Sequence, residues 1–244
     1  MNLSVIPRSR LVGRLLRAPL RLVPRAAVVP IIQGPLHGTR WIVGSGTHGY
    51  WLGWYEADKV RRFAAAISGA RVVYDIGANV GYYSVLASRV LGCAGQVVAF
   101  EPDPQNIAFL RRHLEMNGIE NIRVVEAAVS DRCGEAMFQQ EASRYMGALR
   151  QSGALLVRTL SVDDLVSSGK FPSPDVIKID VEGAEQQVLL GAKQTLRSCH
   201  PLLFLATHST ALHSECCQFL KSFDYKLEAI DGSSLERASE IIAR

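Results

Sequence analysis

An acidic residue, Asp75, stands close to two glycines in this sequence, a combination that could bind a small molecule. Residues 72–84 read VVYDIGANVGYYS, so that Asp75 follows three apolar or aromatic residues and precedes Gly77 and Gly81. A glycine turn between a strand and a helix lets the backbone approach a ligand closely. The pattern is typical of the entrance to a nucleotide-type site.

The chemistry of this loop indicates which cofactor it could bind. The loop lacks the middle glycine of the dinucleotide pattern GxGxxG. A carboxylate at Asp75 would repel a pyrophosphate but attract an ammonium, and S-adenosylmethionine carries an α-ammonium and no phosphate. Glu101 ends the next apolar run, 26 residues later, where an acid binds the ribose hydroxyls of an adenosine. We therefore expect S-adenosylmethionine, held by Asp75, Gly77, Ala78, Asn79, Gly81 and Glu101. The alternative is that Asp75 only caps the following helix.

A second group of reactive side chains lies in KIDVEGAE, residues 178–185, and in PLLFLATH, residues 201–208. Asp180 and Glu182 are two residues apart, which places them on the same side of an extended strand. Two such carboxylates can accept a proton, bind an amine or hold a divalent ion. His208 could act as a general base near neutral pH. We take these three as candidate catalytic residues and assign no metal ligand. The alternatives are a helix cap for Glu182 and a structural imidazole for His208.

All three tryptophans of the chain fall within residues 31–68, a segment rich in glycine and aromatic residues. Trp51, Trp54 and Glu56 could form a wall of the acceptor pocket, because tryptophan faces stack well on sugar rings. An equally good interpretation is that these aromatic residues pack the segment against the core.

The elements that must position these residues alternate between strand and helix from residue 71 onward. Short apolar runs predict buried strands, and apolar residues at helical spacing predict helices. The expected strands are 71–77, 96–102, 122–130, 175–183, 201–208 and 225–230, and the expected helices are 80–91, 104–117, 184–197 and 211–222. Between them, residues 131–170 predict a hairpin, a strand and a short helix. This order predicts a doubly wound α/β fold that binds ligands beyond the carboxyl ends of its strands.

The N-terminal part is basic, with seven arginines and no acid in residues 1–55. Four prolines interrupt residues 1–30, and no apolar run reaches the roughly 18 residues that span a bilayer. We expect a loosely ordered arm over 1–30, with peripheral membrane contact as the alternative. No basic stripe with interleaved aromatics follows, which argues against a nucleic-acid partner. The five cysteines form no CxxC pair, which predicts a reduced, cytoplasmic protein.

Three segments of the sequence, VVYDIGANVGYYSVLAS, GQVVAFEPDPQNIAFLRRHLEMNG and VIKIDVEGAEQQVLLGA, resemble the FkbM family of S-adenosylmethionine-dependent methyltransferases. The resemblance extends over about residues 50–208. It implies a Rossmann-like class I methyltransferase domain at 69–244, with a seven-stranded, mostly parallel sheet behind a cap segment at 31–68. It also implies that Asp131 lies near the adenine. Ala206 departs from the family pattern, in which an acid often precedes the histidine by two residues.

Family members are mostly O-methyltransferases that act on sugars, polysaccharides and polyketide-type products. We therefore expect an enzyme that methylates a hydroxyl of a saccharide or secondary metabolite, with His208 or Asp180 taking the proton. The alternatives are N-methylation, protein methylation, or a binding protein that retains the fold without catalysis. The acceptor, the oligomeric state and any metal dependence stay open.

Overall fold

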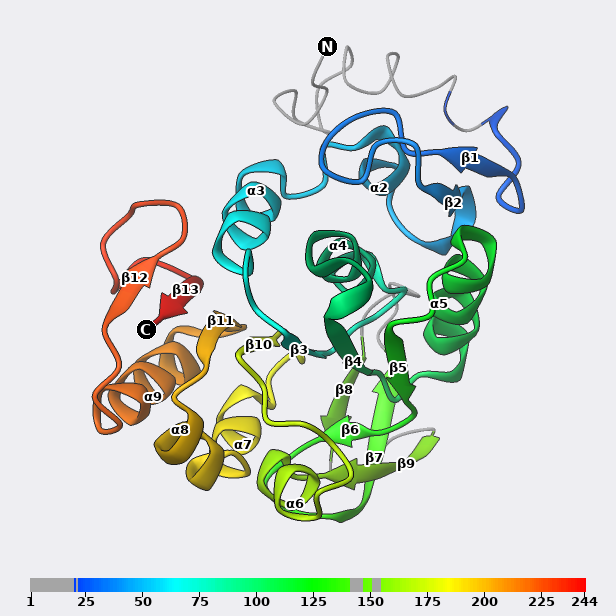
Figure 1. Ribbon diagram of the computed structural model, residues 1–244. Coiled ribbons are helices and arrows are strands. Elements are labelled where there is room, and N and C mark those ends of the chain that lie inside the picture. The colour runs from blue at the N-terminus through cyan, green and yellow to red at the C-terminus, as the bar shows by residue number, and fades with distance from the viewer. Residues whose placement is uncertain (1–19, 21, 141–146, 151–154) are drawn as a thin grey trace.

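The fold is described from a computed structural model, which covers residues 20, 22–140, 147–150 and 155–244. Its main sheet contains β3 (Val72–Ile76), β4 (Gln96–Phe100), β5 (Ile122–Val125), β10 (Val176–Ile179), β11 (Leu202–Ala206), β12 (Leu227–Ala229) and β13 (Glu240–Ala243). The seven strands are ordered β12-β13-β11-β10-β3-β4-β5, and only β13 runs antiparallel to its neighbours. The prediction of a mostly parallel, seven-stranded, doubly wound sheet is confirmed (Figure 1).

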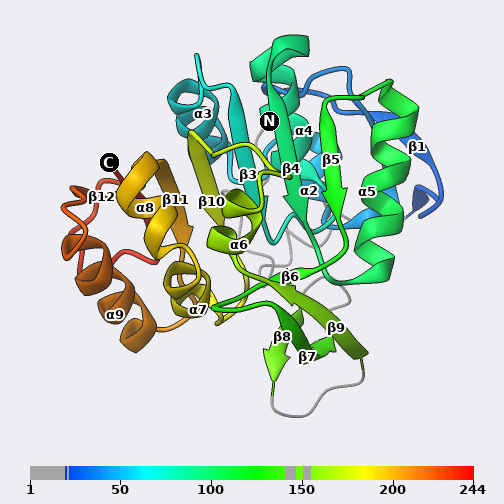
Figure 2. The same ribbon diagram turned by 60° about the horizontal axis from the view of Figure 1, so that its bottom comes forward.

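Helices cover both faces of this sheet (Figures 1 and 2). One face carries α3 (Ala57–Ala66), α4 (Tyr82–Leu91) and α5 (Pro104–Asn117); the other carries α6 (Val162–Ser167), α7 (Glu185–Leu190), α8 (Lys193–Cys199) and α9 (Thr210–Lys221). Alternate residues of each strand enter the two cores, as Val73 and Tyr74 do in β3. The side chains of both cores are buried, which explains the near-continuous apolar strands.

A second sheet confirms the hairpin and the strand predicted within residues 131–170 and differs from the prediction only at 122–130. It contains β6 (Ala128–Val129), β7 (Gly134–Gln140), β8 (Gly147–Arg150) and β9 (Leu155–Leu160), in the order β6-β9-β7-β8. The predicted continuous strand at 122–130 is wrong, because the Ala127 N–H donates to the Val125 carbonyl and turns the chain out of the main sheet. The second sheet lies beyond the carboxyl ends of β4 and β5 (Figure 2).

Two further boundaries differ from the predictions. The single helix expected at 184–197 is divided into α7 and α8 at Gly191, where a Cβ atom would lie 2.1 Å from the Ser130 carbonyl oxygen. The chain therefore breaks its helix where it passes close to another backbone. The sequence also gave no prediction of β13, which inserts between β11 and β12.

The N-terminal segment packs directly on this domain. It contains β1 (Val28–Pro30), β2 (Arg40–Ile42), a 3₁₀ helix (Val43–Ser45) and α2 (His48–Leu52). Outside this segment, a second 3₁₀ helix (Gly92–Ala94) follows α4. Trp41 is fully buried and belongs to the same core as the residues of α4. The segment 31–68 therefore shares its core with the sheet domain. Within the described residues, no helix is long and apolar enough to cross a membrane.

His113 joins the N-terminal segment to the glycine loop. The backbone N–H of Ile42 donates to its Nε2 at 3.2 Å, and its Nδ1 donates to the Val80 carbonyl at 2.9 Å. Its ring stacks on Trp41, with centroids 3.7 Å apart. Burial lowers the pKa of His113 from its ordinary value of 6.5 to about 4, so the imidazole is neutral in the folded protein.

We predict that His113 makes folding stability depend on pH. On unfolding, its pKa rises from about 4 to 6.5, so stability is full above pH 6.5 and falls as the pH drops toward 4. The free energy of unfolding should be about 2 kcal/mol smaller at pH 5 than at pH 7.5 from this residue alone. Urea denaturation of the wild type and of His113→Gln checks this, because the variant should lose that part of the pH dependence. Equal pH dependence in the two proteins would contradict it.

Candidate active site

A cavity of about 420 Å³ opens beyond the carboxyl ends of β3, β4 and β10. This volume suits a small cofactor, since such sites usually measure about 300–1,000 Å³. Its lining consists of Thr47, Tyr50, Tyr55, Gly77, Ala78, Asn79, Tyr82, Tyr83, Phe100, Glu101, Pro102, Asn106, Ala127, Ala128, Val129, Phe138, Lys178, Asp180, Val181, Glu182 and Ala184. The predicted glycine loop and the predicted acidic segment after β10 therefore meet in one cavity.

Gly77 allows the loop to pass against the end of β10. It has φ +78°, and a Cβ atom at this position would lie 1.9 Å from the carbonyl oxygen of Asp180. The N–H groups of Gly77 and Ala78 donate to the Phe100 carbonyl at 3.0 and 2.9 Å. The loop is therefore fixed between β4 and β10, with its backbone along the cavity wall.

Glu101 lies in this wall, 4% exposed. Its Oε2 accepts the N–H of Asn79 at 2.8 Å, and its Oε1 accepts the N–H of Asp103 at 3.0 Å and the side-chain amide of Asn106 at 3.3 Å. Burial raises the pKa of Glu101 to about 7, although these hydrogen bonds oppose the shift. The carboxylate is thus held in place to accept hydrogen bonds from a ligand.

Asp75 lies behind the cavity wall and does not line the cavity. It is 1% exposed, its Oδ2 accepts the Ser84 hydroxyl at 2.6 Å, and its Oδ1 lies 3.2 Å from the Nζ of Lys178. Asp75 and Lys178 are register partners on the neighbouring strands β3 and β10. Ser84 and Lys178 therefore engage this carboxylate in the structure, and its contact with a ligand ammonium stays a prediction.

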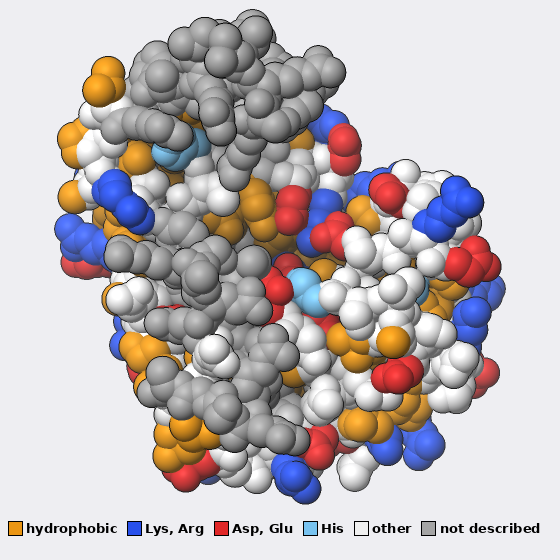
Figure 3. Space-filling model, turned by 180° about the vertical axis from the view of Figure 1, so that it is seen from behind, with side chains coloured by type: hydrophobic (Ala, Val, Ile, Leu, Met, Phe, Trp, Pro, Cys, Tyr) orange, Lys and Arg blue, Asp and Glu red, His pale blue; other side chains and the backbone are white. Residues whose placement is uncertain are grey.

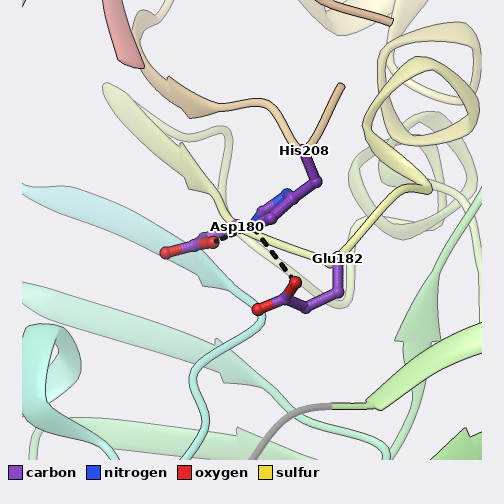
Figure 4. Close-up of side chains that lie close together, drawn as sticks. All are labelled: Asp180, Glu182 and His208. Atoms are coloured by element: carbon purple, nitrogen blue, oxygen red, sulfur yellow. Dashed lines mark ion pairs between the residues drawn. The ribbon is translucent and has the colours of Figure 1, made fainter. Parts of the chain in front are cut away.

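Asp180, Glu182 and His208 come together at the open side of the cavity, from the segments that follow β10 and β11 (Figure 4). The Nε2 of His208 lies 3.6 Å from Oδ1 of Asp180 and 3.3 Å from Oε2 of Glu182. Acidic and histidine side chains gather near the middle of the face shown in Figure 3. The three residues selected from the sequence thus form one cluster, while their catalytic roles stay a prediction.

Glu185, in the first turn of α7, orients His208 from behind. It is fully buried, and its Oε1 lies 2.6 Å from Nδ1 of His208 and 3.0 Å from the backbone N of Gly183. Glu182 and Gly183 have positive φ values of 52° and 105°, which bend the chain back between the strand and the helix. The hydrogen bond to Glu185 raises the pKa of His208 above its ordinary value, and the other carboxylates add to this effect.

Two lysines hold the other side of Asp180. Its Oδ2 lies 3.6 Å from the Nζ of Lys178 and 4.0 Å from the Nζ of Lys59. Burial opposes ionisation of Asp180, but the charges of these lysines outweigh it and lower the pKa of the carboxyl group below its ordinary value. Asp180 is therefore ionised at neutral pH.

Lys59, on α3, contacts the cluster and links it to β13. Its Nζ lies 2.5 Å from Oε1 of Glu240 on β13 and 3.2 Å from Oε2 of Glu56. The hydroxyl of Tyr83 also donates to Glu56 at 2.6 Å. Burial alone would lower the pKa of Lys59, but its carboxylate neighbours raise it above the ordinary value. The ammonium group is therefore charged and links α3 to β13.

Besides Asp75, five residues predicted to contact cofactor or acceptor do not line the cavity: Gly81, Asp131, Trp51, Trp54 and Glu56. Asp131 is exposed, and its Oδ1 accepts the Ser130 hydroxyl at 3.2 Å. Trp51 is 6% exposed and belongs to the core, and Trp54 packs against that core. Glu56 is engaged by Tyr83 and Lys59. For the tryptophans, the structure agrees with the packing alternative.

Sequence reasoning missed three tyrosines of the cavity wall, Tyr55, Tyr82 and Tyr83. Two of them directly follow Gly81, at the start of the helix that leaves the loop, which was a usable signal. The role of Lys178 was also readable, since it precedes Asp180 by two residues and shares its side of the strand. Lys59 and Glu240 carried no such signal, because each lies far from the motifs along the chain.

A profile described as the methyltransferase FkbM domain matches residues 75–227. The chain belongs to this family. The match includes both sequence motifs of the cavity, and it leaves Lys59 and Glu240 outside. The resemblance found in the sequence is therefore confirmed, as is the Rossmann-like class I methyltransferase fold.

Two curated relatives are similar to this chain. The hexuronic acid methyltransferase AglP of Haloferax volcanii is 30% identical over 145 residues, which cover 59% of each chain. The 2-O-methyltransferase NoeI of Sinorhizobium fredii is 33% identical over 147 residues, which cover 51% of this chain and 58% of NoeI. The chain thus spans less than two thirds of the length of either relative.

A solved structure supports the fold. The methyltransferase FkbM from Methylobacillus flagellatus superposes with a TM-score of 0.52 at 20% sequence identity, over 72% of this chain and 43% of that protein. At this level of identity the similarity concerns the fold alone.

We predict that the buried pair of Asp75 and Lys178 is needed for stability. Lys178→Met should lower the free energy of unfolding by about 3–5 kcal/mol, because it leaves a carboxylate buried without its partner. The double variant with Asp75→Asn should lose less than the sum of the single variants. Urea denaturation measures all three. The matched control is the exposed pair of Arg112 and Glu115, where Arg112→Ala should cost less than about 1 kcal/mol. A cost for Lys178→Met no larger than this control would contradict the prediction.

Proposed function

We propose that this protein transfers a methyl group from S-adenosylmethionine to a hydroxyl of a sugar or polysaccharide. The observation that carries the proposal is one cavity whose wall contains the glycine loop and Glu101 on one side and Asp180 and Glu182 on the other. The names of AglP and NoeI, a hexuronic acid methyltransferase and a 2-O-methyltransferase, support a saccharide acceptor.

The cavity fits the cofactor in size and in the chemistry of its lining. Glu101, fixed by Asn79 and Asn106, offers carboxylate oxygens to the ribose hydroxyls. The close approach at Gly77 leaves backbone, rather than side chain, along one wall. The apolar side chains of Phe100 and Val129 suit the adenine. When bound, S-adenosylmethionine supplies an electrophilic methyl group on a positively charged sulfur.

The cluster after β10 and β11 then serves the acceptor. The acceptor hydroxyl attacks the methyl carbon, so that the O–C bond forms as the C–S bond breaks, and the hydroxyl proton passes to the cluster of Asp180, Glu182 and His208. In the neutral form of His208, Glu185 would hold the ring proton on Nδ1, so that Nε2 is the proton acceptor. Placing both reactants in one closed cavity supplies much of the rate enhancement.

Other expectations from the sequence stay predictions. These are a cytoplasmic location, the lack of a nucleic-acid partner, membrane contact through residues 1–30, and the division of the chain at residues 30 and 68. Residues 1–19 and 21 lie outside the described part of the chain. The described cysteines are all free.

We predict that binding of S-adenosylmethionine depends on the ionisation of Glu101. Its pKa of about 7 leaves it about 10% ionised at pH 6, so affinity should rise about tenfold between pH 6 and pH 8. Calorimetry at both pH values should show this rise in the wild type and a weak, flat affinity in Glu101→Gln. Glu115, which is exposed on α5 and outside the cavity lining, provides the matched control, since Glu115→Gln should follow the wild type. An affinity for wild type that does not change with pH would refute the assignment.

We also predict that Asp180→Ala and His208→Ala lower turnover by about 100-fold or more, the usual effect of losing a general base. The affinity for S-adenosylmethionine, measured by calorimetry, should change far less. Turnover is followed as transfer of a labelled methyl group to a panel of saccharides. His37→Ala removes an exposed imidazole outside the cavity lining and should retain full activity. Normal turnover in both site variants would rule out the assigned roles.

A further inference from the structure

We propose that Asp180, Glu182 and His208 form a binding site for a divalent cation, Mg²⁺ or Mn²⁺, which holds two neighbouring oxygens of the acceptor. One ligand atom from each residue lies within 4.8 Å of the others. Cation binding itself can be tested without any acceptor, whereas the role of the cation rests on the proposed methyl transfer.

The distances fit six-coordinate geometry. With metal–ligand distances of about 2.1 Å, adjacent ligand atoms of an octahedral ion are about 3.0 Å apart and opposite ones about 4.2 Å. Here Nε2 of His208 lies 3.3 Å from Oε2 of Glu182 and 3.6 Å from Oδ1 of Asp180. Shifts of up to about 0.6 Å would bring the three atoms to these separations. Two carboxylates and an imidazole are a donor set that suits Mn²⁺ and, through the oxygens, Mg²⁺.

Glu185 provides a second and separate observation. It lies outside the set of three, is fully buried, and holds Nδ1 of His208 at 2.6 Å. Because Glu185 engages Nδ1, Nε2 is the ring nitrogen that faces the oxygens of Asp180 and Glu182, as a metal-binding nitrogen would. Histidines that bind metals commonly donate their other N–H to a carboxylate in this way.

The neighbouring lysines leave this position available. Lys178 and Lys59 both face Oδ2 of Asp180, whereas the oxygen that faces His208 is Oδ1. The two oxygens of one carboxylate thus serve different partners. Asp180 can bind a cation through Oδ1 while the lysines retain its other oxygen.

The position of the cluster indicates what the cation would do. Asp180 and Glu182 line the cavity, and the side chain of His208 is 31% exposed at its open side. Three protein ligands leave about three positions of a six-coordinate ion open. Two of them could take adjacent oxygens, such as two vicinal hydroxyls or the hydroxyl and carboxylate of a uronic acid. The cation would lower the pKa of the coordinated hydroxyl and fix its orientation, and the hydroxyl proton would leave to solvent, because Nε2 of His208 is then a ligand of the cation.

The binding test uses the full chain, freed of metal with a chelator and dialysed. Mn²⁺ is titrated in, and the free ion is followed by electron paramagnetic resonance. We expect one Mn²⁺ per chain, displaced by excess Mg²⁺, with binding at least tenfold weaker in Glu182→Gln and in Asp180→Asn. Glu185→Gln should weaken it about tenfold through His208. Glu115→Gln, which alters a carboxylate that is 70% exposed on α5, is the matched control and should bind as the wild type does.

Two results would overturn the site. One is the absence of stoichiometric Mn²⁺ binding to the wild type, which would mean that a proton on Nε2 of His208 fills the gap. The other is unchanged Mn²⁺ binding in Glu182→Gln. This variant is the least at risk of misfolding, because Glu182 is partly exposed. Its circular dichroism spectrum and melting temperature are compared with those of the wild type.

The role is tested separately by methyl transfer with chelator, Mn²⁺ and Mg²⁺. Activity restored only by added cation, on acceptors with adjacent oxygens, supports it, and full activity in chelator overturns it. If no saccharide is methylated under any condition while Mn²⁺ still binds to the cluster, the proposed function fails and the cation site stands.

Discussion

A buried ammonium group between two carboxylates determines the geometry of the site. The Nζ of Lys178 lies 3.2 Å from Asp75 and 3.6 Å from Asp180, at the carboxyl ends of β3 and β10. A buried carboxylate without a partner is costly, so these three charges must stay together. They align the end of β3 with the end of β10 at the point where Gly77 passes the Asp180 carbonyl. Both halves of the cavity, the glycine loop and the acidic segment, therefore depend on this arrangement.

Segments outside the family match complete the charge arrangement. Lys59 comes from α3 and Glu240 from β13, and both lie beyond residues 75–227. Glu240 is the register partner of Ala206, so it places a carboxylate on the strand beside the position where the sequence lacks the expected acid. The N-terminal segment also reaches the glycine loop through His113, which binds Ile42 and Val80. The N-terminal segment, α3 and β13 thus support the site, although none of them contains the motifs that form it.

The sequence predicted the convergence of Asp180 and His208 because parallel strands end at the same edge of a sheet, so residues that follow them must meet. It predicted α5 equally well, since Asp103 accepts the N–H of Gln105 as an N-cap and Gly118 ends the helix. It could not predict the contact between Glu185 and His208, which depends on two successive positive φ values before α7. Nor could it show that Asp75 is engaged by Lys178, since that requires knowing that β3 and β10 are neighbours in register.

The balance of charge around the cavity explains why a cationic ligand suits it. The described side chains near the cluster include six carboxylates but only two ammonium groups. The carboxylates belong to Glu56, Asp75, Asp180, Glu182, Glu185 and Glu240, and the ammonium groups to Lys59 and Lys178. The lysines occupy the inner side of the cluster, at Oδ2 of Asp180. In a cavity of low polarity this excess favours ligands that bring positive charge. A sulfonium donor supplies one such charge and loses it when the methyl group leaves, so the electrostatic attraction falls as the reaction proceeds. A divalent cation between Asp180 and Glu182 would supply the other and would remain throughout. In the proposed function, these carboxylates would thus favour binding of the charged donor and release of its neutral product.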